Sequence, residues 1–194
     1  MTILALPPAP GSDEHVSLAL ANTAVALPGG HRFDELTSPD ATTEWLEIHG
    51  LVPDRTTLQS YCQNRLTGLR SDIRAALTAQ VEGTVPPRHA VDGINRALAS
   101  MPSAPVLQHD ANHGFRRTIK HPTTRLVEHA MSQIAANCVL LLTGEDAGAI
   151  AQCQASPCDR FMLRTHARRH WCSVRCGDRV RAARAYARKQ GTPP

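Results

Sequence analysis

Four cysteines near the C-terminus have the spacing of a metal site. Cys153 and Cys158 form a C-x4-C pair, and Cys172 and Cys176 form a C-x3-C pair that begins after thirteen further residues. A tight turn lets both thiolates of one pair reach a single ion, and the intervening segment can fold back as a hairpin that delivers the second pair. Four thiolates complete a tetrahedron around Zn²⁺ and leave no position for water. We therefore predict one structural zinc ion and no catalytic metal.

A pair of disulfides is the alternative use of the same four cysteines. The first ten residues have no charged start, and their short apolar run is broken by Pro7 and Pro8, so they do not resemble a signal peptide. The longest apolar segment, around residues 126–142, is interrupted by Glu128, His129, Gln133 and Asn137, so we expect no membrane span. We therefore expect a cytoplasmic protein, in which thiols stay reduced and clustered cysteines favour a metal.

Two histidines and two further cysteines are also possible metal ligands, but we expect none of them to bind the ion. His166 and His170 lie between the two pairs and could compete as ligands, although four cysteines already suffice. Cys62 and Cys138 fall on the apolar faces of predicted helices, far apart in the sequence. We interpret these two as small buried hydrophobic residues.

The segment that carries the cysteines is strongly basic. Residues 151–194 contain ten basic and two acidic side chains, a net charge of +8, whereas residues 1–150 carry −4. Residues 178–190 are rich in alanine and should be helical, with three arginines on one face that could follow phosphates. Arginine forks also suit guanine edges, but phosphate contacts alone would account for the charge, and a solvated basic tail is the alternative. The predicted nucleic-acid contacts are Arg164, Arg168, Arg169, Arg175, Arg179, Arg181, Arg184 and Arg188.

The region before the cysteines should be mainly helical. Residues 14–27 read as a strand, or as a strand running into a loop. A short helix capped by Thr42 or Thr43 should end at Gly50 and bury Trp45, Leu46 and Ile48. Longer helices are predicted over residues 54–80, 88–100 and 124–142 from apolar residues spaced three and four apart, with Tyr61 and Val91 on their apolar faces. Between the last two, residues 104–110 and 115–121 read as a β-hairpin.

Two parts of the chain resemble domains that are known to occur together. The C-terminal part resembles the CGNR zinc finger of bacteria, through Cys153-Gln154-Ala155-Ser156-Pro157-Cys158, Phe161, Arg168-Arg169, Trp171-Cys172-Ser173 and Cys176-Gly177-Asp178-Arg179. The N-terminal part resembles the ABATE domain that usually precedes this finger, through Asn22-Thr23, Asp34-x-Leu36-x-Ser38-Pro39, Trp45-Leu46 and Gly50-Leu51. Three positions depart from the pattern. Asp178 stands where the family name places Asn, Leu163 replaces an Asp, and the second cysteine pair is one residue closer.

This resemblance implies an α+β protein. Residues 1–148 would be an ABATE-like sensor or dimerisation domain, mainly helical with a small sheet or hairpin. Residues 149–194 would be a CGNR-like zinc finger of treble-clef or ribbon type that ends in a basic helix. The implied function is a stress-response transcription regulator that binds DNA, with a small-molecule effector or a homodimer as further expectations.

Two other functions are weaker alternatives. The same basic finger could serve an RNA-binding or ribosome-associated protein. His109, Asp110 and His113, with His121 nearby, could hold a catalytic metal, but they fall at a predicted turn, where polar residues are usually solvated. The sequence has no Gly-rich phosphate loop, nucleophile elbow or acidic dyad, so we predict that the chain is not an enzyme.

Overall fold

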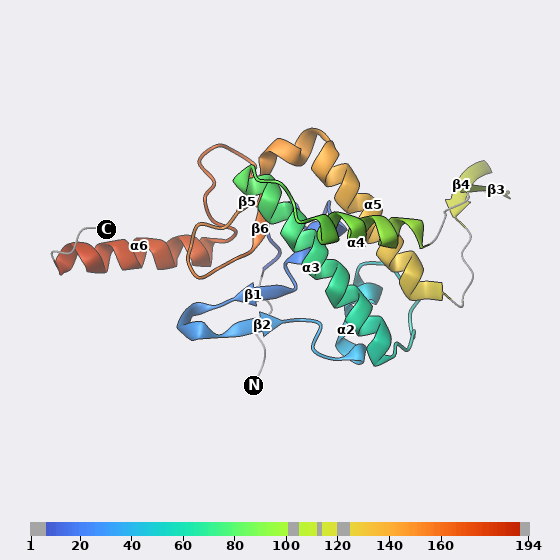
Figure 1. Ribbon diagram of the computed structural model, residues 1–194, viewed down its shortest axis with the longest axis horizontal. Helices are drawn as coiled ribbons and strands as arrows, with labels where there is room; N and C mark the ends of the chain where they lie inside the picture. The colour runs from blue at the N-terminus through green and yellow to red at the C-terminus, as the bar shows by residue number, and fades with distance from the viewer. Residues whose placement is uncertain (1–6, 101–104, 112–113, 120–124, 191–194) are drawn as a thin grey trace.

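The computed structural model describes residues 7–100, 105–111, 114–119 and 125–190 (Figure 1). Its helices are α1 (Val16–Ala21), α2 (Pro39–Ile48), α3 (Ser60–Glu82), α4 (Arg88–Ala99), α5 (Leu126–Thr143) and α6 (Val174–Lys189). Its strands pair into antiparallel hairpins: β1 (Ala24–Ala26) with β2 (Arg32–Asp34), β3 (Pro105–Asp110) with β4 (Gly114–Ile119), and β5 (Ile150–Gln152) with β6 (Phe161–Leu163). The predicted α+β class is confirmed.

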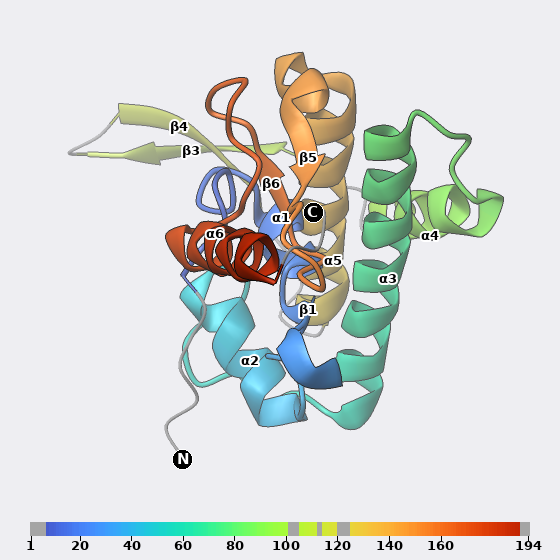
Figure 2. The ribbon, with the colours of Figure 1, turned by 90° about the vertical axis from the view of Figure 1, so that its left-hand side faces the viewer.

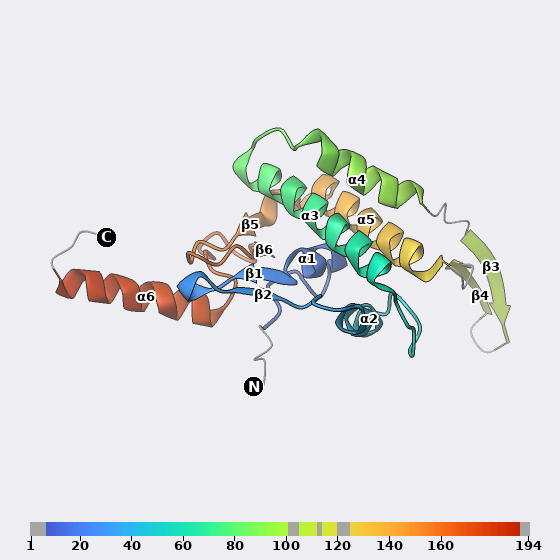
Figure 3. The same ribbon diagram turned by 60° about the horizontal axis from the view of Figure 1, so that its bottom comes forward.

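Helices α3, α4 and α5 pack against one another and form the body of the protein (Figures 2 and 3). The apolar faces predicted for residues 54–80 and 124–142 are buried there, with Leu66, Ile73, Leu77 and Ile134 inaccessible to solvent. By length and composition alone α5 could cross a membrane, which differs from our expectation. Its buried residues belong to the same core as those of α3, so in this fold α5 is the central helix of the body.

The first half of the strand predicted over residues 14–27 is wrong, because residues 16–21 form α1. Val16, Leu18 and Leu20 alternate with other residues as they would in a strand. A segment of only six residues is too short to distinguish the two-residue period of a strand from the 3.6-residue period of a helix. The helix start is secured from α5: the Ser17 N–H donates to Asn137 Oδ1 at 3.0 Å, and the Ser17 hydroxyl donates to the same oxygen at 2.6 Å. A side chain from another helix thus satisfies an amide that a helix start leaves open.

The cap predicted for α2 is also wrong. Ser38 caps the helix, because its Oγ accepts a hydrogen bond from the Ala41 N–H at 3.1 Å. Thr42 and Thr43 lie inside the helix, and their hydroxyls donate to backbone carbonyls four residues earlier. Trp45 and Leu46 are buried as predicted.

Three residues predicted to be buried face solvent. Ile48 is 73% exposed, Tyr61 is 67% exposed and Val91 is 39% exposed. Helical spacing alone does not show how far the neighbouring elements cover each of these side chains. The β3–β4 hairpin is confirmed and projects from the body at the opposite end from α6 (Figure 1).

The β5–β6 hairpin packs directly against the helical body. Phe161 of β6 is fully buried in the same core as α3 and α5. The side chain of Asn22, just after α1, pairs with the Phe161 backbone as a neighbouring strand would. Its Oδ1 accepts from the Phe161 N–H and its Nδ2 donates to the Phe161 carbonyl, both at 2.8 Å.

Two ion pairs reinforce the same region. Arg74 of α3 donates to Asp159 Oδ2 at 2.8 Å, and the Ala26 N–H donates to Asp159 Oδ1 at 2.7 Å. Burial lowers the pKa of Arg74, and the neighbouring Asp159 opposes that shift. Arg70 forms a two-point pair with Asp34, at 2.6 and 2.7 Å. Burial by itself raises the pKa of Asp34, but the hydrogen bonds to its carboxylate, chiefly from Arg70, outweigh it and the pKa is lowered.

Candidate metal centre and nucleic-acid interface

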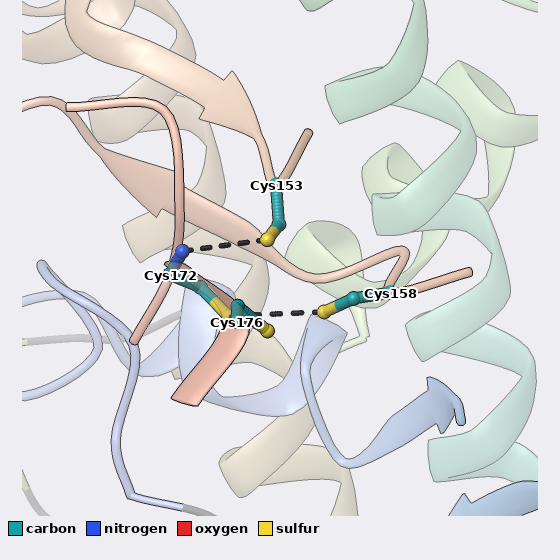
Figure 4. Close-up of side chains that lie close together, drawn as sticks. All are labelled: Cys153, Cys158, Cys172 and Cys176. Carbon is teal, nitrogen blue, oxygen red and sulfur yellow. Dashed lines mark hydrogen bonds between the residues drawn. The ribbon is translucent and has the colours of Figure 1, made fainter. Parts of the chain in front are cut away.

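The β5–β6 hairpin and the start of α6 bring the four cysteines together (Figure 4). Cys153 directly follows β5, and Cys158 lies in the turn before β6, where its N–H donates to the Ala155 carbonyl at 2.9 Å. Cys172 precedes α6 and Cys176 lies in its first turn. Ser173 caps this helix, accepting from the Cys176 N–H at 3.2 Å. A hairpin supplies one pair and a helix start the other, which is a treble-clef arrangement.

The sulfur positions fit a single zinc ion. All four Sγ atoms lie within 4.8 Å of one another. The Cys158–Cys172 and Cys172–Cys176 Sγ–Sγ distances are both 3.7 Å. Tetrahedral zinc–thiolate bonds of about 2.3 Å place the sulfurs about 3.8 Å apart. The distances are far longer than a disulfide bond of about 2.05 Å, and all six cysteines are free. The predicted Zn²⁺ site is therefore confirmed over the disulfide alternative.

Crowding of the thiols makes the site dependent on a cation. Hydrogen bonds from Cys158 and Cys172 hold the pKa of Cys153 well below that of an ordinary thiol. The hydrogen bond with Cys153 raises the pKa of both Cys158 and Cys172, and burial adds to the increase, although the hydrogen bond with Cys158 opposes it at Cys172. Several thiolates buried this close together would repel one another. A bound Zn²⁺ supplies the positive charge that allows the remaining protons to leave.

Two side chains next to the cysteines contact them directly. Arg160 is only 5% exposed, and it donates to Cys172 Sγ at 3.9 Å and to the Pro7 carbonyl at 2.8 Å. Such outer contacts orient the ligands and stabilise thiolate charge. Trp171 packs against the cysteine cluster, as predicted.

The other metal-ligand candidates lie apart from this site. His166 and His170 are exposed, and the only group of potential ligands that meets within the described residues consists of the four cysteines. Cys138 is fully buried in the helical core, as predicted, whereas Cys62 packs against the core and is only half-buried.

The alternative enzyme site gains no geometric support. His109 is exposed and packs edge-on against Phe115, with ring centroids 4.7 Å apart. Arg116 lies 3.9 Å from the Asp110 carboxylate. His113 and His121 lie outside the residues that the structure describes.

Helix α6 leaves the metal site and extends away from the body (Figures 1 and 3). The helix therefore presents most of its surface to solvent. Six of the eight predicted contact arginines are exposed: Arg164, Arg168, Arg175, Arg181, Arg184 and Arg188. The first two lie in the loop between β6 and α6 and the other four on α6, so the finger brings them onto one module.

Three of the eight arginines already have partners inside the finger. Arg169 is half-buried and donates to the Thr165 hydroxyl at 3.4 Å. Arg179 is half-buried and donates to the Ala155 carbonyl, so it holds the turn between the first two cysteines. Arg181 pairs with Asp178 and lies over the Trp171 ring, 5.6 Å from its centroid. Asp178, the departure from the family pattern, thus offsets one charge of the arginine face.

Arg184 and Arg188 have no ion-pair partner within the described part of the chain, and the helical spacing places them on the same face. These two are therefore the free centre of the basic surface. The sequence shows only that all of these residues are charged. It does not show that Arg179 and Arg181 have partners whereas Arg184 and Arg188 have no ion pair within the described residues.

Fold and site together define a zinc-finger protein: a helical body joined to a four-cysteine treble clef that ends in a basic helix. Residues 14–145 match the ABATE family, whose description is "putative stress-induced transcription regulator", and residues 150–189 match the CGNR zinc finger. The chain therefore belongs to the ABATE family and carries a CGNR zinc finger. Neither match is to an enzyme family. A comparison with curated proteins gives no significant match.

Some residues that shape the site were not predicted for these roles. Asn22 and Arg160 connect the finger to the body through contacts with residues more than 130 positions away in the sequence. Asn22 was noted only as a carrier of the family resemblance. No spacing pattern could have indicated these contacts, because they depend on the tertiary packing of the two ends of the chain.

Proposed function

We propose that this protein is a zinc-dependent nucleic-acid-binding protein, and specifically a DNA-binding transcription regulator of the cytoplasm. The observation that carries the proposal is α6, which emerges from the metal site with an exposed arginine face. Zinc fixes the first turn of the helix through Cys176, and the remaining turns are free to lie along a phosphate backbone. The body would sense an effector or dimerise.

Charge supports the same proposal. The module carries a net charge of +8, and the body carries −4, so a polyanion is drawn to one end of the molecule. Neutralising phosphates with arginine releases condensed counterions, so affinity should fall steeply with salt. The regulator description of the matched family favours duplex DNA over RNA as the partner.

The test is fluorescence anisotropy with the zinc-loaded full chain, a library of genomic duplex fragments and an RNA hairpin over a range of salt. The double variant Arg184→Gln/Arg188→Gln should weaken DNA binding and reduce the slope of log K against log salt by about 0.9 for each lost phosphate contact.

The matched control is Arg88→Gln/Arg96→Gln, which removes two exposed arginines of α4 and the same net charge. It should leave DNA affinity nearly unchanged. Equal losses in both double variants would show attraction by net charge only. Tighter binding to RNA would favour the RNA-binding alternative, and no binding to either nucleic acid at low salt would refute the proposal.

A further inference from the structure

A cavity of about 530 Å³ lies between the β1–β2 hairpin and the zinc finger. One wall includes Leu27 and Phe33 of the hairpin region, and the other includes Ser173 and Arg175 at the start of α6. Small-molecule sites commonly have volumes of about 300 to 1,000 Å³ and lie where two structural units meet. The volume is far larger than a single metal ion needs, so the cavity extends well beyond the zinc site.

The two walls differ in chemistry. The hairpin contributes mainly apolar side chains, whereas the finger contributes three guanidinium groups, from Arg160, Arg175 and Arg179. The cavity lining that the structure describes includes no carboxylate. A zinc ion with four thiolates carries a charge of −2, so the three arginines leave one positive charge uncompensated beside an apolar wall.

The three arginines are not equally available. Arg160 is held by Cys172 and the Pro7 carbonyl, and Arg179 is held by the Ala155 carbonyl. Arg175 is exposed and has no ion-pair or hydrogen-bond partner within the described residues. Guanidinium groups bind carboxylates and similar anions through paired hydrogen bonds. Arg175 is therefore the group that can accept an anionic ligand without breaking an existing contact.

We propose that this cavity binds a small organic anion with an apolar body, whose charged group meets Arg175 and whose apolar part lies against Leu27 and Phe33. Such a ligand touches the body on one side and the first turn of α6 on the other. Its role as an effector of nucleic-acid binding rests on the function proposed above, but its binding does not.

Nuclear magnetic resonance of the ¹⁵N-labelled, zinc-loaded full chain tests the site with two probes. The first, 1-naphthoate, has an apolar ring system and a carboxylate, and the second, 1-naphthalenemethanol, has the same rings without the charge. Naphthoate should shift the amide resonances of Leu27, Phe33 and Ser173 in a saturable way. It should bind about tenfold more tightly than the alcohol, because a charged hydrogen bond is added.

Two arginine variants separate the site from general attraction. Arg175→Gln should weaken naphthoate binding about five- to tenfold and leave the alcohol unaffected. Arg164→Gln removes an exposed arginine outside the cavity lining and should change neither. Absence of saturable shifts at the three residues, equal affinity for both probes, or equal losses in both variants would overturn the proposal. No nucleic acid is present, so failure of the proposed DNA binding would leave these results unchanged.

Discussion

Replacing Asn22 with alanine should strongly destabilise the protein, because this side chain satisfies both backbone groups of Phe161. Each of its two hydrogen bonds measures 2.8 Å, and Asn22 is only 5% exposed. The substitution leaves a buried N–H and a buried carbonyl without partners, and each such group costs about 1–3 kcal/mol. We therefore expect Asn22→Ala to lower the free energy of unfolding by about 2–6 kcal/mol.

Urea and thermal unfolding of the zinc-loaded chain, followed by circular dichroism, measure this loss. For a chain of this size each kcal/mol lowers Tm by roughly 2–4 °C, so the expected decrease is about 4–24 °C. Asn64→Ala is the matched control, because Asn64 is exposed on α3 and should matter by less than about 0.5 kcal/mol. If Asn22→Ala costs no more than the same roughly 0.5 kcal/mol, Asn22 does not hold the Phe161 backbone as described.

Three further predictions concern the thiols and an ion pair. Elemental analysis should find one zinc per chain, lost in Cys158→Ser and retained in Cys62→Ser; retention in both would contradict the ligand set. Burial raises the pKa of Cys138 to about 12, so this thiol stays protonated at pH 8 and should resist a disulfide reagent until the protein unfolds. The lowered pKa of Asp34 stabilises the fold above the ordinary carboxyl pKa of about 4, and this stabilisation is lost as the pH falls through the lowered value. Asp34→Asn should therefore be about 1 kcal/mol less stable from pH 7 to pH 5, and the difference should shrink in more acidic urea titrations; a constant difference would exclude the Arg70 pair as its cause.

Features that depend on local spacing were predictable from the sequence. The cysteine pairs identified the zinc site because a tight turn alone brings two thiolates together. The apolar residues at three- and four-residue intervals identified α3 and α5, because these helices are long enough for the period to be distinct. The β3–β4 hairpin was predictable in the same way, because Gly114 between the two expected strands is a residue that readily adopts a positive φ, and its φ in the structure is 69°.

Features that depend on distant partners were not predictable. The start of α1 is held by Asn137, which in the sequence reads only as a polar interruption of an apolar helix. The arginines of the finger look equivalent in the sequence, yet Arg179 holds a turn and Arg184 is free. The cavity beside Arg175 is formed by segments about 140 positions apart, and no pattern in either segment indicates it.

The contacts that attach α6 to the finger involve the N-terminal half of the helix, so its far end moves with any rotation of that base. Its sixteen residues extend about 24 Å at 1.5 Å per residue, and Cys176, the Ser173 cap, Arg179 and Arg181 hold the base. A rotation of roughly 10° at that base moves the far end by about 4 Å, which exceeds the 3.4 Å between successive charges along one DNA strand. If the protein binds DNA as proposed, such a rotation changes which phosphates Arg188 reaches and leaves the helical body undisturbed, so a slight adjustment at the junction is enough to regulate binding.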